Sequence, residues 1–126
     1  MYYNLGKKKI DLSSLSNNLA NFFVKRHFTV SVKKYNAGYK LIARPKIYNE
    51  IRNKIIVEIK GTPNSFSVTF KPTSFWQKIG VLAPLINLFI GGYLFLRDLK
   101  SEEKLEKIEK EFWIYTNYLI SAYLRN

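Results

Sequence analysis

The sequence predicts an α+β fold, and three observations support this prediction. Apolar residues recur at helical spacing near the N-terminus, four later segments alternate between apolar and polar residues, and a long segment with helical spacing follows. A length of 126 residues suits one domain. We therefore expect a single α+β domain over residues 1–126. Residues 1–73 should form a helix and a basic sheet, and residues 74–126 a hydrophobic helical region and a C-terminal helix.

The first expected element is an amphipathic helix in residues 11–26. Asp11 or Ser13 can cap its start, because short polar side chains accept hydrogen bonds from the free N–H groups of a first turn. The other face is rich in Ser and Asn, so the helix should pack on something through one side only. The apolar residues that define its buried side are Leu12, Leu15, Leu19, Phe22 and Phe23.

The next four elements are strands in residues 27–35, 39–44, 55–60 and 65–71. Each alternates apolar and polar residues, and short turn segments in residues 36–38 and 61–64 join them into two hairpins. A nine-residue connector, 45–53, links the hairpins, and Pro45 should end the second strand. The alternation predicts a four-stranded antiparallel sheet that is covered on one face and open on the other.

The last element is a long helix in residues 101–124. Ser101 is expected to be its N-cap, with two glutamates in the first turn where they favour the helix dipole. The first half has a charged face. The second half is apolar nearly all round, so something must enclose it.

Residues 79–96 contain no charged residue over 18 positions. As a helix they would reach about 27 Å, just short of a hydrocarbon core of about 30 Å. Pro84 is well placed to open a short helix, and Gly91 and Gly92 to close or kink it. We interpret the segment as core or self-association surface. Spanning a membrane and lying in a membrane surface are the alternatives.

Together with the last helix, this segment carries more apolar surface than one small domain easily buries, so a homo-oligomer is expected. The residues expected to contact another copy, or a membrane in the alternative, are Trp76, Leu82, Leu85, Leu88, Phe89, Tyr93, Phe95 and Trp113.

The net charge of +12 is concentrated in residues 1–97, which hold 16 Lys and Arg against three acidic residues. Lysines neutralise phosphates and tyrosines stack on unpaired bases, so the polar sheet face is the candidate nucleic-acid surface. Tyr35, Tyr39 and Tyr48 should lie near its edges. An alternative is a solvated, lysine-rich face that protects strand edges. The candidate binding residues are Lys33, Lys40, Arg44, Lys46, Arg52, Lys54, Lys60 and Lys71.

The sequence contains few residues that could form a catalytic or metal-binding site. The chain has no Cys and one histidine, His27, whose only candidate acid–base partner is Glu58. We expect a non-enzymatic binding protein with no cofactor, no metal and no small-molecule substrate. Its expected partners are another copy of itself and a polyanion such as nucleic acid. It should be cytoplasmic, or membrane-associated if residues 79–96 act as an anchor.

The composition is rich in Lys, Ile, Asn and Tyr, with a single glutamine at Gln77 and a Lys- and Glu-laced helix. In this respect the whole chain resembles small uncharacterised proteins of thermophilic archaea or of archaeal viruses. The resemblance carries no functional residue over to this chain.

Overall fold

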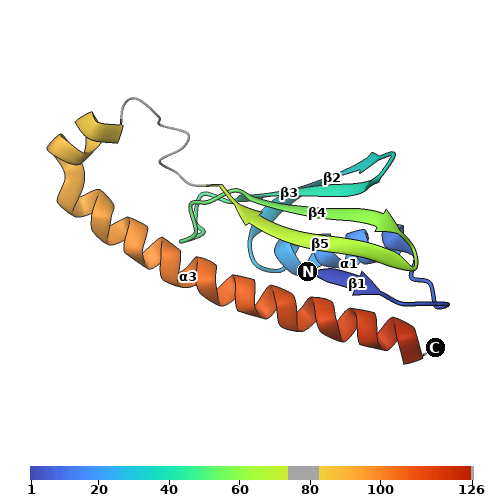
Figure 1. Ribbon diagram of the computed structural model, residues 1–126. Helices are drawn as coiled ribbons and strands as arrows, with labels where there is room; N and C mark the ends of the chain where they lie inside the picture. Colours follow the sequence, from blue (N-terminus) through green and yellow to red (C-terminus); the bar gives the residue numbers. More distant parts are fainter. Residues whose placement is uncertain (74–82, 126) are drawn as a thin grey trace.

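In the described part of the chain, two helices lie against one face of an antiparallel sheet (Figure 1). The computed structural model describes residues 1–73 and 83–125, and the side chains of all of these except 83–100. The predicted α+β class is confirmed. In chain order the elements are β1 (Tyr2–Asn4), α1 (Leu12–Val24), β2 (Phe28–Tyr35), β3 (Gly38–Pro45), β4 (Ile55–Thr62), β5 (Ser65–Pro72) and α3 (Ala83–Arg125).

The sheet has five strands in the order β1-β5-β4-β3-β2, so the prediction of four strands is wrong by one. The four predicted strands and both hairpins are present, and Pro45 is the last residue of β3. The additional strand, β1, pairs antiparallel with β5 at the sheet edge, where Tyr3 lies opposite Phe66. Three residues are too few to show an alternating pattern, so β1 can be identified only from its pairing with β5.

α1 begins and packs as the sequence predicts. The Asp11 carboxylate accepts a hydrogen bond from the Ser13 N–H at 3.0 Å, which caps the helix. The five apolar side chains of the predicted stripe are all buried in the core. Leu41, Val57 and Val68 project from β3, β4 and β5 into the same core.

α3 is one continuous helix where the sequence predicts two helical pieces. It runs from Ala83 through the Gly91–Gly92 pair and past Ser101, so these glycines do not close it and Ser101 is not its N-cap. Ser101 is instead 1% exposed and faces the connector between β3 and β4. Its hydroxyl accepts a hydrogen bond from the Arg52 N–H at 3.1 Å and lies 3.4 Å from the Asn53 side-chain oxygen. Ser101, which the sequence predicts as a helix cap, therefore connects α3 to the connector instead.

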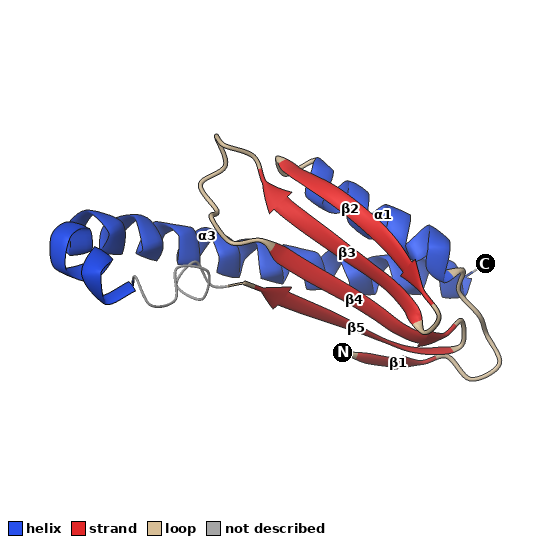
Figure 2. Ribbon diagram, turned by 90° about the horizontal axis from the view of Figure 1, so that it is seen from above, coloured by secondary structure: helices blue, strands red, loops and turns tan. Residues whose placement is uncertain are grey.

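The second half of α3 packs on the same side of the sheet as α1 (Figures 1 and 2). Phe112 is fully buried, and its ring centroid lies 5.8 Å from that of Phe22 in α1 and 5.1 Å from that of Phe70 in β5. The Arg26 guanidinium pairs with Glu111 at 3.0 Å. The core thus lies between one sheet face and the two helices.

The opposite side of α3 is open in the single chain. Ile114 is 71% exposed and Tyr118 is 64% exposed, one helical turn apart. Trp113, from the predicted contact set, is half-buried against Phe112 at a ring distance of 5.0 Å. The apolar half of α3 is therefore enclosed on one side only, and the homo-oligomer that would enclose the other side stays a prediction.

The rest of the predicted contact set lies largely beyond what can be described. The described residues do not include Trp76, nor residues 79–82, of which Leu82 is one. Five more residues are in the helical backbone of α3, but their side chains are not described: Leu85, Leu88, Phe89, Tyr93 and Phe95. Within the part of the chain that is described, none of the helices combines the length and apolar character needed to cross a bilayer.

Candidate nucleic-acid interface

The outer face, as we call the side of the sheet turned away from the two helices, is strongly basic. Directly paired residues of an antiparallel sheet project to the same side, so the register assigns each side chain to a face. None of the described helices lies over the outer face (Figures 1 and 2). Five of the eight predicted binding residues project from it, namely Lys33, Lys40, Arg44, Lys60 and Lys71.

One carboxylate, that of Glu58, lies in the middle of these cations. Its two oxygens contact the ammonium groups of Lys60 at 3.0 Å and Lys71 at 3.8 Å, and Lys40 is its register partner in β3. The hydrogen bond from Lys60, with the positive charges of Lys60, Lys71 and Lys40, lowers the pKa of Glu58 below its usual value of 4.5. Glu58 is therefore ionised at neutral pH and orients the lysine side chains around it.

Among the residues that the structure describes on the outer face, five cations stand against one acid. Lys33 and Arg44 form no ion pair with any of the residues that the structure describes, and they project from β2 and β3, away from Lys60 and Lys71. Lys33 stands directly opposite Lys40, so two like charges face each other across neighbouring strands. This arrangement is destabilising for a sheet on its own and favourable for contact with an anion.

The other three predicted binding residues lie off the four main strands. Lys54 directly precedes β4, while Lys46 and Arg52 are in the connector. Lys46 and Arg52 line a small hollow of about 210 Å³ together with Ile47 and Asn49. The sequence pattern could not place a connector residue on a face, because the connector has no strand periodicity.

The tyrosines divide between the two sides of the sheet. Tyr35 projects from the outer face and is 51% exposed, whereas Tyr39 is on the side of the helices. Tyr48 is in the connector, with its ring edge-to-face on His27 at 5.2 Å. Tyr2 in β1 is 66% exposed and projects from the outer face, opposite Ser67. Sequence reasoning missed Tyr2 because it missed its strand.

A hollow of about 270 Å³ interrupts the outer face at Gly38. Gly38 is paired with Tyr35 on one side and Lys60 on the other, so the row of outward side chains has a gap there. Glycine is required, because φ is +150° and a Cβ would lie 1.8 Å from the Ile59 carbonyl oxygen. Lys40 and Glu58 also line the hollow.

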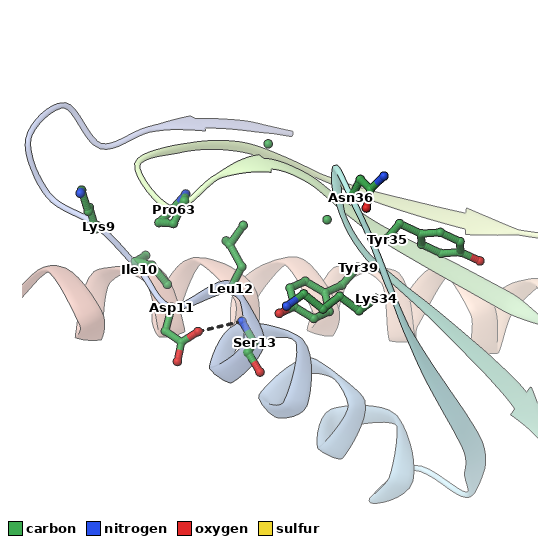
Figure 3. A pocket seen from close by; sticks show the side chains of 12 residues that line it. Lys9, Ile10, Asp11, Leu12, Ser13, Lys34, Tyr35, Asn36, Tyr39 and Pro63 are labelled. Atoms are coloured by element: carbon green, nitrogen blue, oxygen red, sulfur yellow. Dashed lines mark hydrogen bonds between the residues drawn. The ribbon is translucent and has the colours of Figure 1, made fainter.

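A second hollow, of about 370 Å³, lies on the other side of the β2–β3 hairpin, next to the start of α1 (Figure 3). Lys34 and Tyr39 point toward the helix there, and Lys9 lies at the rim. The Asp11 carboxylate is also at this rim, where it caps α1. Opposite charges therefore mix in this hollow, and the outer face is the stronger candidate for an anion site.

His27 and Glu58 are not brought together. His27 follows α1 with a positive φ of 68°, and its N–H donates to the Val24 carbonyl oxygen at 3.3 Å as the helix ends. It lines a hollow between α1, the connector and α3, whereas Glu58 is held on the outer face by lysines. Among the residues that the structure describes, no three potential metal ligands of the His, Cys, Asp or Glu type form a group.

Comparison of the chain with protein-family models, with curated proteins and with solved structures found no significant match. The compositional resemblance to small proteins of thermophilic archaea and their viruses stays a prediction. The functional argument therefore depends on the outer face itself.

Proposed function

We propose that the protein is a non-enzymatic binding protein whose outer face binds a polyanion, and that this polyanion is nucleic acid. The observation that supports the proposal is a sheet face that none of the described helices covers and whose described residues include five cations and one acid. Lysine and arginine provide the charge that neutralises phosphates, and tyrosines at the edge provide surfaces for bases.

The dimensions of the outer face suit a strand of nucleic acid. Four strands of eight residues form its main part, which is about 25 Å long and about 15 Å wide. Phosphates are repelled by one acid and attracted by five cations, so the net attraction is long-range and sensitive to salt. Five phosphate contacts with a single strand give an expected slope of about −3.5 for the logarithm of the binding constant against that of salt concentration.

The test is a titration of fluorescently labelled oligonucleotides, single-stranded and double-stranded, by fluorescence anisotropy over a range of salt concentrations. The informative variant is the double substitution Lys33→Gln/Arg44→Gln, because these two cations form no ion pair with the described residues and leave the Glu58 cluster in place. It should lower affinity and reduce the salt slope by about 1.4 for a single strand.

The matched control removes the same two charges from the exposed side of α3, in Lys107→Gln/Lys110→Gln. It should bind as the unchanged protein does apart from a small long-range effect. Equal losses in both double variants would mean that net charge alone drives binding. Salt-insensitive binding, no binding at low salt, or binding to anionic lipid vesicles in preference to any oligonucleotide would each overturn the proposal.

A further inference from the structure

The hollow at Gly38 gives the basic outer face one site of distinct chemistry. The residues that line it include Tyr35, which is 51% exposed, and Lys40, Glu58 and Lys60. Its gap is built into the backbone, because no residue other than glycine fits between β2 and β4 at this position. Its volume, about 270 Å³, is below the range of about 300–1,000 Å³ usual for ligand pockets, so it suits one flat ring system.

The walls of the hollow define what such a ring should carry. An exposed tyrosine offers a surface for stacking, and the neighbouring lysines offer positive charge to a phosphate. The Glu58 carboxylate can only accept hydrogen bonds, and each of its oxygens keeps a free lone pair beyond its contact with Lys60 or Lys71. A ligand that fits should therefore present N–H donors side by side on the edge of a planar ring, next to a phosphate.

We propose that the hollow binds one unpaired guanine of a single strand that lies across the outer face, an inference that rests on the proposed function. The guanine ring would stack on Tyr35, and its N1–H and 2-amino groups would donate to the Glu58 carboxylate. Adenine and cytosine place a ring-nitrogen acceptor beside their amino group, and thymine flanks its N–H with two carbonyls. A carboxylate repels these acceptors, so it discriminates in favour of guanine.

The proposal is tested with oligo-dT strands of about 12 nucleotides that carry one central guanine, adenine, cytosine or thymine. The unchanged protein should bind the strand with guanine about tenfold more tightly than the all-thymine strand. Glu58→Gln should bind the all-thymine strand at least as tightly as before, because a negative charge is lost, and should show no preference for guanine. A general loss of repulsion would instead strengthen binding of all four strands equally and leave the preference intact.

A second pair of variants tests the stacking surface. Tyr35→Ala should weaken binding of the guanine strand about tenfold or more, whereas Tyr48→Ala, which removes another exposed tyrosine in the connector, should change it little. If all four strands bind with the expected salt dependence and equal affinity, the guanine site is refuted and the basic interface stands. If none binds, the proposed function fails first. If circular dichroism shows that Glu58→Gln is unfolded, two results still test the guanine site. These are the preference of the unchanged protein for the guanine strand and the comparison of Tyr35→Ala with Tyr48→Ala.

Discussion

The strongest structural prediction concerns Phe112, which connects α3 to the rest of the core. Its ring is fully buried, and the ring centroids of Phe22, Phe23 and Phe70 lie 5.1 to 5.8 Å from its own. Replacing a buried Phe by Ala costs about 3–5 kcal/mol, and the better helix propensity of Ala returns about 0.5 kcal/mol. Phe112→Ala should therefore lower the free energy of unfolding by about 3–4 kcal/mol, a large share of the about 5–15 kcal/mol typical of a domain.

The measurement is urea unfolding followed by circular dichroism, with the slope compared between proteins to detect a change in the unfolding transition. Ile114→Ala, two positions along the same helix, is the matched control and should cost less than about 0.5 kcal/mol because Ile114 is 71% exposed. A loss below about 1 kcal/mol in Phe112→Ala would show that α3 does not pack on the core as described. A larger loss in Ile114→Ala that depends on protein concentration would support the predicted homo-oligomer.

Three further substitutions probe the buried helix residue and the outer face, each read as unfolding free energy in urea. Ser101→Asp should destabilise the fold by more than about 2 kcal/mol, because it places a charge on a buried face of α3. Unchanged stability would indicate that a helix begins at this residue. Glu58→Gln should be less stable than the unchanged protein at pH 7. The lowered pKa of Glu58 means that its ionised form stabilises the fold above pH 4.5, and that this contribution is lost as the pH falls through the folded-state pKa. The deficit should therefore shrink below pH 4.5, and a deficit constant down to pH 2 would contradict the role of Lys60. Lys33→Gln should stabilise the fold by about 0.2–1 kcal/mol, because it removes the repulsion of Lys40; a loss of stability would count against that repulsion.

The sheet is the part of the fold that the sequence predicts best, because a strand with one buried face records its environment in every second residue. The alternation in residues 65–71 predicts that Phe66 and Val68 point inward and Ser67 outward, and the register of β5 confirms all three. β1 could not be found in this way. Its existence depends on the free edge of β5, which is a property of the assembled sheet and not of residues 2–4.

α3 shows the opposite limit of local reasoning. A serine followed by two glutamates has the chemistry of a helix start, and two adjacent glycines have that of a helix end. Both signals describe the preferences of an isolated chain. In the folded protein the helix continues through Ser101, and the Ser101 hydroxyl accepts a hydrogen bond from the Arg52 N–H in the connector instead of capping a helix.

The sequence predicts the positive charge of the outer face, but it does not predict which charged residues are neighbours there. A period of two assigns Lys33, Lys40 and Lys60 to one side of a sheet from sequence alone. Their neighbours depend on strand register, which places Glu58 opposite Lys40 and leaves the gap at Gly38 between two strands. Folding gains nothing from Lys33 opposite Lys40, since like charges in direct register oppose sheet formation. A bound polyanion would turn that unfavourable pair into two favourable contacts, so the face that weakens the free protein is the face expected to gain most from a ligand.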